Sequence, residues 1–370
     1  MLTLSISHTK AIAIIPMITG ALSILGSGAI IYKILLDRKK KITKVYHRLM
    51  LAMSCLDIIM SMSAALSTIP IPKDIPSVWG NIGNETTCNI QGFTSVFGFG
   101  VIFYNTSLSI YFLLCIRYGM TESKIGKTVE PAMHIISILY PLSCAIAGLY
   151  LKVYNFSETR CWVSPYPQDC INNDQIDCDW GEFAYSFRWL YAGGSLIIFW
   201  CVILTSQFLI FWTFWCQDKA MNKKYGTYSI VPRCEKKRVS LPVSSNGPNP
   251  QLNNLRKRTL AVATQASFFV LASTMTYIWP LLYRGIEQTS SSKPSLFLLY
   301  VKQVFFPLQG LFNFLVYVRP SYIKIRAQNM TKSRTWALRH ALLPQSPRNL
   351  ATKPGLRRRR SSVYDRGCIE

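Results

Sequence analysis

The residues with the most chemical potential in this sequence are polar side chains placed inside long apolar segments. One set lies along Ser295–Val318 at spacings of four, three, four and four positions, which puts it on one face of a helix. Its members are Lys302, Phe306, Gln309, Asn313 and Tyr317. Ordinary hydrogen bonding between helices explains one or two such residues better than four. The set therefore predicts a polar network inside a helix bundle.

Asp57 is a second polar residue within an apolar segment. It lies roughly 12 residues into Tyr46–Thr68, which is about 18 Å at the helical rise. A carboxylate at that depth is costly and almost always faces the bundle interior or water. We interpret Asp57 as the centre of a hydrated network that rearranges during switching. The alternative is a protonated side chain bonded to a neighbouring helix.

Lys302 is the candidate ligand contact. It lies about seven residues into its segment, roughly 10 Å from the start, and an ammonium there must be paired or hydrated. We expect it to help bind an anionic or strongly polar small molecule. The other candidate contacts are Tyr277, Trp279 and Tyr300. The alternative is a structural ion pair with Glu182 or Asp179.

Two further positions mark helix irregularities and ends. Pro280 predicts a kink or a local opening, and Gly193-Gly194 predicts the same in an earlier segment. Arg117 lies at the end of a third apolar segment, where composition alone favours an interface charge that snorkels to water.

Seven apolar segments must position these residues. Half of the 370 residues are hydrophobic and 16% are charged, whereas a soluble domain carries about 25% charge. Segments of roughly 20 apolar residues are typical of membrane-spanning helices. They are Ala11–Leu36, Tyr46–Thr68, Gly92–Tyr118, Pro131–Leu151, Trp189–Trp215, Thr259–Tyr283 and Ser295–Val318. The sequence predicts an all-α membrane protein with a seven-helix bundle and excludes a soluble enzyme.

Basic residues predict the orientation of the bundle. With the N-terminus outside, the inner segments hold 31 of the 41 Lys and Arg residues, and the first short inner loop, 37–45, holds five of them. Positively charged loops stay in the cytoplasm, so we expect the N-terminus outside and the C-terminus inside. The net charge of +24 then indicates attraction to an anionic lipid leaflet, and nucleic acid is not an expected partner.

The expected domain organisation follows from these segments. A short outer N-terminus, 1–10, precedes the seven-helix domain, 11–322, which contains a basic and disordered third inner loop at about 216–258. Pro320 is expected to end the last helix. The basic tail, 323–370, is expected to be mostly disordered.

Several residues are candidates for covalent modification. Four cysteines lie in the outer segments and predict two disulfides, for which three connectivities exist. They are Cys88, Cys161, Cys170 and Cys178. Asn84 and Asn155 begin glycosylation sequons in outer loops. Ser240, Ser361 and Ser362 follow basic residues and are candidate kinase sites, although such segments are also explained by membrane proximity alone.

The segment Pro307–Tyr322, PLQGLFNFLVYVRPSY, resembles the seventh helix of the cyclic-AMP-receptor-like group of G-protein-coupled receptors. That group includes slime-mould cyclic-AMP receptors and fungal glucose-sensing receptors, and is similar to secretin-type receptors. Further matches are Cys88-x-x-Gln91-Gly92-Phe93, Cys161-Trp162, Ile116-Arg117-Tyr118 and the position of Asp57. The resemblance covers residues 11–322.

The resemblance implies a receptor that carries an extracellular small-molecule signal to a heterotrimeric G protein at the plasma membrane, without a cofactor. An internal membrane remains an alternative location. The resemblance also implies that Cys88 pairs with Cys161, which leaves Cys170 for Cys178. Together with the helix irregularity and the buried polar residues above, the expected switch residues are Asp57, Arg117, Pro280, Gln309, Asn313 and Tyr317. The chain departs from related patterns at Ile116, where an acid usually precedes the arginine, so the usual local lock on Arg117 is absent.

Other functions fit the sequence less well. A microbial-rhodopsin-like photoreceptor or pump binds retinal through a lysine of its last span, where Lys302 lies, but residues 92–118 hold no carboxylate counterion. A small-solute transporter commonly shows duplicated halves, and no internal repeat is found. An enzyme is not expected, because the four histidines are scattered without metal-ligand spacing.

Overall fold

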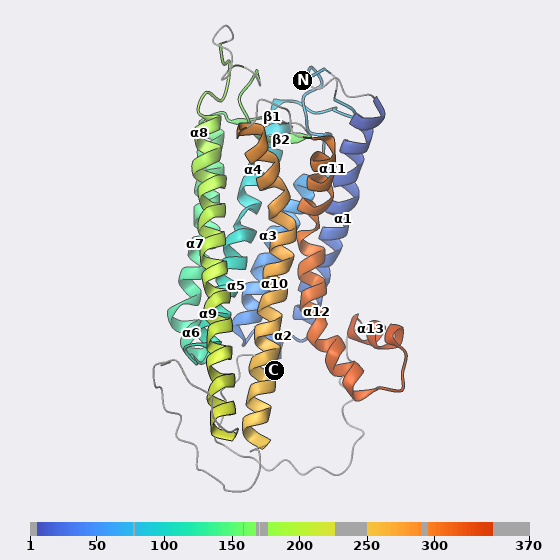
Figure 1. Cartoon of the computed structure of the whole chain (residues 1–370). Helices are drawn as coiled ribbons and strands as arrows, with labels where there is room; N and C mark the ends of the chain where they lie inside the picture. The colour runs from blue at the N-terminus through green and yellow to red at the C-terminus, as the bar shows by residue number, and fades with distance from the viewer. Residues whose placement is uncertain are drawn as a thin grey trace.

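The computed structural model describes residues 6–76, 78–157, 159–167, 170, 177–225, 250–289 and 295–342. Within these ranges, seven apolar helical spans lie side by side in one bundle (Figure 1). They are Ile6–Leu36, Val45–Leu66, Glu85–Ile116, Glu130–Tyr150, Ala184–Cys216, Thr259–Ile286 and Leu296–Gln328. Each corresponds to one expected segment, which confirms the predicted fold class. Most spans are longer than predicted, because the helices continue beyond the apolar segments into polar residues.

Among the described residues, the regular secondary structure is helical apart from one short hairpin. In chain order the elements are α1 (Ile6–Leu36), α2 (Arg38–Lys41), α3 (Val45–Leu66), α4 (Glu85–Gly98), α5 (Gly100–Ile116), α6 (Glu122–Thr128), α7 (Glu130–Tyr150), β1 (Tyr154–Ser157), β2 (Arg160–Val163), α8 (Ala184–Arg188), η1 (Trp189–Gly193), α9 (Gly194–Tyr225), α10 (Pro250–Thr289), α11 (Leu296–Phe305), η2 (Phe306–Leu308), α12 (Gln309–Gln328) and α13 (Arg334–Leu342). A helix pairs its own backbone N–H and C=O groups, which is required in a membrane because lipid tails offer these groups no hydrogen-bond partners.

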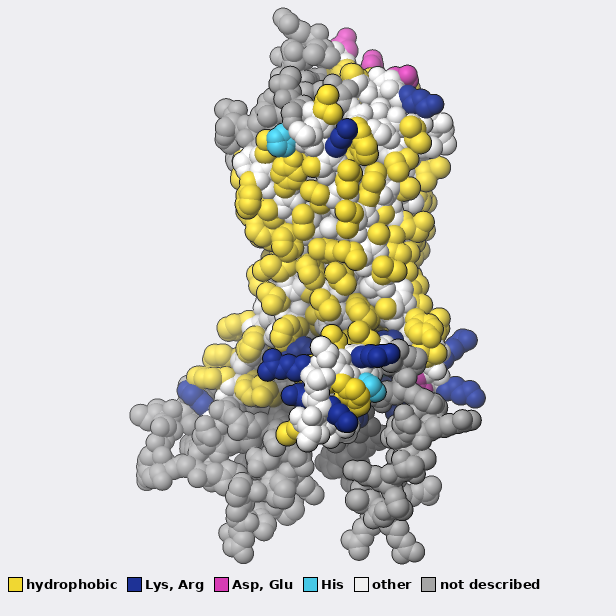
Figure 2. All heavy atoms as spheres, turned by 90° about the vertical axis from the view of Figure 1, so that its right-hand side faces the viewer, with side chains coloured by type: hydrophobic (Ala, Val, Ile, Leu, Met, Phe, Trp, Pro, Cys, Tyr) yellow, Lys and Arg dark blue, Asp and Glu magenta, His cyan; other side chains and the backbone are white. Residues whose placement is uncertain are grey.

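The outer surface of the bundle is apolar over its middle. Large hydrophobic side chains such as Leu25, Ile198 and Phe208 are exposed on the spans. On the face that Figure 2 shows, hydrophobic side chains form a broad band across the middle of the molecule. Lys and Arg gather where the band ends near α13. Soluble proteins rarely expose so broad an apolar surface. The chain is therefore a multi-pass membrane protein. We call the end of the bundle with β1 and β2 the hairpin end, and the opposite end the α13 end (Figure 1).

Three spans contain local irregularities. The third breaks at Phe99, between α4 and α5, and the seventh contains the 3₁₀ turn η2 at Phe306–Leu308. The fifth contains η1, a π-helical turn that ends at Gly193, where the glycine pair predicted an irregularity. Pro280 lies inside α10, which is continuous across it.

The prediction that Pro320 ends the seventh helix is wrong, since α12 continues to Gln328. Pro320 has no N–H and cannot bond to the Val316 carbonyl four residues earlier. Gln265 of α10 supplies the missing donor, because its Nε2 lies 2.7 Å from the Val316 oxygen. A neighbouring helix therefore satisfies the carbonyl that the proline leaves open.

The predicted loop and tail boundaries also need correction. Helix α9 extends to Tyr225 and α10 begins at Pro250, so the third loop at the α13 end is shorter than residues 216–258. Residues 323–328 are helical and α13 follows, with Ala337 and Ala341 buried. The ammonium of Lys33 donates to the Ala341 carbonyl. Packing against α12 and the hydrogen bond from Lys33 of α1 thus hold α13 at the end of the bundle.

The contact at Val316 predicts a measurable interaction. Gln265→Leu removes the donor and leaves a buried carbonyl unpaired, so we expect the free energy of unfolding to fall by about 1–3 kcal/mol. Adding Pro320→Ala restores a backbone donor and should recover most of the loss. Thermal unfolding of the purified chain in detergent measures both. A double variant no more stable than Gln265→Leu alone would contradict this account.

Candidate functional site

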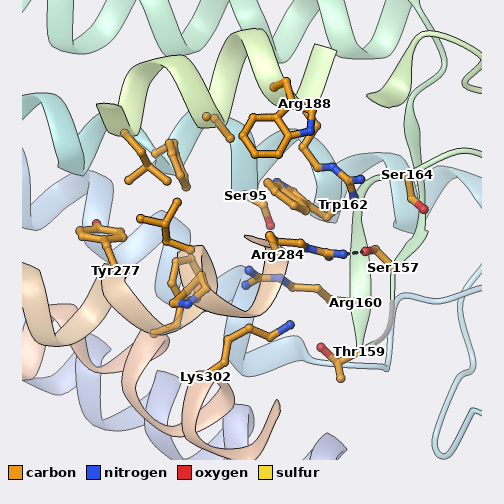
Figure 3. Close-up of a pocket in the computed structure, with 18 of the residues that line it drawn as sticks. Ser95, Ser157, Thr159, Arg160, Trp162, Ser164, Arg188, Tyr277, Arg284 and Lys302 are labelled. Atoms are coloured by element: carbon orange, nitrogen blue, oxygen red, sulfur yellow. Dashed lines mark hydrogen bonds between the residues drawn. The ribbon is translucent and has the colours of Figure 1, made fainter. Parts of the chain in front are cut away.

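A cavity of about 480 Å³ lies between the spans at the hairpin end (Figure 3). This volume is within the range of about 300–1,000 Å³ found for small-molecule sites. Side chains from α3, α4, the hairpin, α8, η1, α9, α10, α11 and η2 line it. Segments distant in sequence therefore converge on one space.

The hairpin covers the cavity and is held in place covalently. Strands β1 and β2 pair antiparallel, with Ser157 opposite Arg160. A disulfide joins Cys161 of β2 to Cys88 of α4. Gln91, one turn after Cys88, accepts a hydrogen bond from the Cys161 backbone N–H at 2.9 Å. The disulfide and this hydrogen bond fix the position of β2 against the third span.

A second disulfide closes a small loop beyond the hairpin. It joins Cys170 to Cys178, which are eight positions apart in sequence. Together with the bond between Cys88 and Cys161, these are the two pairings that the resemblance implied.

The tip of the hairpin is also bonded to the sixth and seventh spans. Arg284 of α10 donates from Nη2 to the Ser157 hydroxyl at 3.1 Å, as the dashed line in Figure 3 shows. Gln303 of α11 donates from Nε2 to the Thr159 hydroxyl at 2.7 Å. A shift of the hairpin tip therefore reaches both spans directly.

Four cationic side chains line the cavity. They are Arg160, Arg188, Arg284 and Lys302. The Arg160 guanidinium lies 4.9 Å from the Phe306 ring centroid, and the Lys302 ammonium lies 3.7 Å from the Tyr283 ring centroid. No Asp or Glu is among the lining residues in the part of the chain that the structure describes. The cations of the cavity come from four separate elements, β2, α8, α10 and α11.

The deeper wall of the cavity is apolar and aromatic. Phe99, Leu196, Tyr277 and Phe306 contribute to it. The rings of Tyr277 and Phe306 meet edge to face, with centroids 6.1 Å apart. The Tyr277 hydroxyl is buried and has no hydrogen-bond partner among the described residues. Buried polar atoms are normally paired, so this hydroxyl can accept a partner from a bound molecule or water.

A second, much smaller cavity lies below this wall. Asp57, Ser61 and Gln309 line it, and Met60 and Phe306 line both cavities. These two side chains are thus a shared wall between the larger cavity and the surroundings of Asp57.

Asp57 joins three spans through one carboxylate oxygen. Its Oδ2 accepts hydrogen bonds from Ser27 at 2.6 Å and from Ser23 at 3.2 Å, both on α1. The Ser23 hydroxyl in turn accepts the backbone N–H of Gly310 at 2.7 Å. Ser61, one turn further along α3, also donates to Oδ2 at 3.4 Å. The two shorter hydrogen bonds of Asp57 thus come from a neighbouring helix, and its Oδ1 has no partner within the described ranges.

Gly310 allows the seventh span to lie in close contact with Asp57 of α3 and Ser27 of α1. A Cβ atom at this position would lie 2.1 Å from Asp57 Oδ2 and 2.3 Å from the Ser27 hydroxyl. No side chain fits there without moving α1, α3 or α12.

The polar face of the seventh span points into the bundle, as predicted. Gln309, Asn313 and Tyr317 are buried, and Gln309 donates from Nε2 to Asn313 Oδ1 at 3.2 Å. Near the α13 end, the ammonium of Lys41 donates to the Tyr317 hydroxyl at 3.3 Å. Partial burial lowers the pKa of this Lys41 ammonium. The polar face thus extends from the cavity to the opposite end.

Two predicted ligand contacts lie elsewhere. The Tyr300 hydroxyl is 2.6 Å from His8 Nδ1, and Trp279 packs on Phe305 with ring centroids 5.9 Å apart. Neither lines the cavity, although Lys302 and Tyr277 do. Tyr300 is two positions from Lys302, and Trp279 is two positions from Tyr277. In a helix, side chains two positions apart point about 200° away from each other around the axis.

Arg117 and Pro280 occupy different ends of the bundle. Arg117 lies at the α13 end, where its Nη1 donates to Thr213 of α9 at 3.3 Å. Pro280 lines the cavity. Ser240, Ser361 and Ser362 lie outside the described residues.

Sequence reasoning missed the three arginines of the cavity. Tyr277, Pro280 and Arg284 are three and four positions apart, so one face of α10 carries all three. That spacing was a usable signal. Arg160 directly precedes Cys161, but the hairpin turn that aims it into the cavity has no comparable sequence pattern.

Comparison with known proteins identifies the fold. No protein-family model matches the chain, and no curated protein matches it in sequence. Among solved structures, the crystal structure of squid rhodopsin is similar, with a TM-score of 0.58 and 14% identity over 91% of this chain and 83% of that chain. The chain therefore has the seven-helix fold of squid rhodopsin.

The contact at Gly310 predicts a selective effect of added volume. We expect Gly310→Ala to lower the thermal stability strongly, because overpacking costs about 1–3 kcal/mol and here involves a carboxylate. Gly28→Ala on α1 is the matched control, since nothing lies within 4 Å of its added Cβ. It should leave the unfolding temperature unchanged or raise it. Equal losses in the two variants would argue against this packing.

Proposed function

We propose that the chain is a G-protein-coupled receptor that transduces an extracellular small-molecule signal to a heterotrimeric G protein. The observation that carries this proposal is the wall shared by the two cavities. Met60 and Phe306 contact both the larger cavity and the space around Asp57. A molecule in the larger cavity therefore contacts the boundary of the buried polar network.

The position of Phe306 supports transmission along the seventh span. It begins η2, the short 3₁₀ turn that precedes Gln309 and Gly310. Gly310 bonds to Ser23, which bonds to Asp57. A ligand that favours one position of Phe306 thus changes the balance between two arrangements of α1, α3 and α12. Differential affinity for two states is the requirement for such a switch.

The charge distribution supports an orientation with the hairpin end outside the cell. Lys and Arg gather near the α13 end (Figure 2), which by the positive-inside rule faces the cytoplasm of the plasma membrane. A G protein would then engage the α13 end. Arg117 and Thr213, which connect the third and fifth spans there, are at a position where span movements alter that surface.

The finer relationship to cyclic-AMP-receptor-like receptors rests on particular residues. Pro307–Tyr322, which resembles the seventh helix of that group, forms most of η2 and the first part of α12. Cys88 and Cys161, which resemble its paired cysteines, are disulfide-bonded. These positions support the proposed assignment.

A retinal photoreceptor fits the cavity less well. Lys302 lines it, as a retinal-binding lysine would, but three arginines line it too, and no Asp or Glu does so within the described part of the chain. A protonated Schiff base would add a cation to this positive field without a carboxylate from those residues.

G-protein activation tests the proposal. Membranes from cells that express the full chain with individual Gα subunits should bind more GTPγS when a stimulating member of a small-metabolite panel is added. Phe306→Ala, which removes part of the shared wall, should reduce the maximal response severalfold at unchanged surface expression. Phe208→Ala, on an exposed face of α9, is the control and should respond as the parent does.

Two results would contradict the proposal. One is the absence of nucleotide exchange above that of control membranes for every Gα subunit and metabolite, with the folded chain at the cell surface. The other is a response that Phe306→Ala and Phe208→Ala change equally.

The proposed orientation makes a prediction about glycans. Asn84 is exposed at the start of α4, whereas Asn155 lies in β1 and donates from Nδ2 to the Ser164 carbonyl at 2.8 Å. We therefore expect a glycan on Asn84 and none on Asn155. Asn84→Gln should remove the glycosidase-sensitive mass on a denaturing gel, and Asn155→Gln should leave it unchanged. A mass loss from Asn155→Gln would refute this assignment.

A further inference from the structure

Two cysteines at the α13 end are disulfide-bonded, in addition to the four described above. They are Cys115, in the last turn of α5, and Cys216 of α9. The four cysteines described above pair among themselves, and Cys55, Cys144 and Cys201 are free thiols. Within the described part of the chain, Cys115 and Cys216 are therefore the partners left for each other.

A hydrogen bond between the same two helix segments supports this pairing. Arg117, two positions after Cys115, donates from Nη1 to the Thr213 hydroxyl at 3.3 Å. Thr213 lies three positions before Cys216, and positions three apart share one face of a helix. Cys216 therefore lies on the face of α9 that meets the third span. Both cysteine side chains are only partly buried, so neither is enclosed in the core.

The location of this pair points to redox chemistry. This inference rests on the proposed function, which assigns the α13 end to the cytoplasm. Glutathione and thioredoxin keep cytoplasmic thiols reduced, and the disulfides that do form there are usually transient and catalytic or redox-sensing. We propose that Cys115 and Cys216 are a reversible thiol–disulfide site, whose oxidised form ties the fifth span to the third.

The reaction requires a small disulfide such as oxidised glutathione as the oxidant. The thiolate of one cysteine attacks a glutathione sulfur, breaks the S–S bond of glutathione disulfide and releases one glutathione thiolate. The second cysteine attacks the protein sulfur of this mixed disulfide and releases the other glutathione. Two electrons thus pass from the two cysteines to glutathione disulfide, and the two thiol protons end on two glutathione thiols. Reduced glutathione reverses both steps.

The disulfide restrains one end of a span whose other end lines the cavity. Trp189 and Gly193 of the fifth span line the cavity, and Cys216 lies near the opposite end of the same span. A disulfide holds its two Cα atoms within about 4.4–6.8 Å, whereas a hydrogen bond such as that from Arg117 to Thr213 breaks and forms readily. Oxidation therefore fixes the fifth span to the third, and the oxidised receptor should respond less to its ligand.

Titration with glutathione buffers tests the site directly. The purified full chain in neutral detergent is equilibrated with mixtures of reduced and oxidised glutathione, quenched with acid, alkylated and mapped by peptide mass. We expect Cys115 and Cys216 to change from two thiols to one linked pair within the series. The link between Cys88 and Cys161 is the internal reference and should persist throughout, because structural disulfides resist reduction by glutathione.

The unfolding temperature measures whether the linked pair constrains the fold. The oxidised chain should unfold several degrees above the reduced chain, because a cross-link that closes a long loop restricts the unfolded chain. Cys216→Ser should abolish this difference. Cys201→Ser is the matched control, because it removes a free thiol from the same helix, and it should keep the difference.

Three results would refute the redox site. The first is a peptide map that leaves Cys115 and Cys216 unlinked in every mixture, or links either of them to another cysteine such as Cys234 or Cys368. The second is a pair that stays linked in every mixture in which the reference disulfide does. The third is an unfolding temperature that Cys201→Ser and Cys216→Ser change equally.

Nucleotide exchange separates this inference from the proposed function. The oxidised chain should give a severalfold smaller maximal GTPγS response than the reduced chain, and Cys216→Ser should respond equally in both buffers. Equal responses of the parent chain in both buffers would overturn the restraint on the fifth span and leave the receptor proposal intact. If the cysteine pair titrates as expected but no Gα subunit is ever activated, the redox site is supported and the receptor proposal fails.

Discussion

A carboxylate inside a membrane bundle must obtain its hydrogen bonds from the protein, because the surrounding lipid offers none. Asp57 meets this requirement through Ser23 and Ser27 on α1. The same serine accepts the Gly310 N–H of the seventh span, and a glycine is the only residue that fits there. The requirements of one carboxylate therefore determine how closely the first, second and seventh spans pack.

The larger cavity, on the other side of Met60 and Phe306 from Asp57, depends on how the hairpin that covers it is held in place. The hairpin is held by the disulfide to Cys88, by Gln91 and by the buried Tyr154, whose hydroxyl donates to the Ala145 carbonyl of α7 at 2.8 Å. At its tip, Ser157 and Thr159 receive hydrogen bonds from the sixth and seventh spans. The cover of the cavity is thus rigid toward the third span and linked by weaker hydrogen bonds to the sixth and seventh.

These two regions meet at Phe306. The ring packs on Tyr277 and lies beneath the Arg160 guanidinium, while the η2 turn that it begins leads to Gly310. A 3₁₀ turn has poorer hydrogen-bond geometry than the α-helix around it and often marks a hinge. The seventh span is therefore best able to change shape at the residue that touches both the cavity and the Asp57 pocket.

The sequence by itself determined the seven spans and the inward face of the seventh. Both depend on local patterns, namely hydropathy over about 20 residues and the helical period. The same patterns failed at Pro320, because its effect depends on Gln265 from another helix. Tyr300 and Trp279 were predicted as ligand contacts because their types suit a ligand site, but the helical phase places them outside the cavity that Lys302 and Tyr277 line. Only the tertiary structure decided the cavity, since Arg160, Arg284 and Lys302 are far apart in sequence and converge only when the hairpin folds over the bundle.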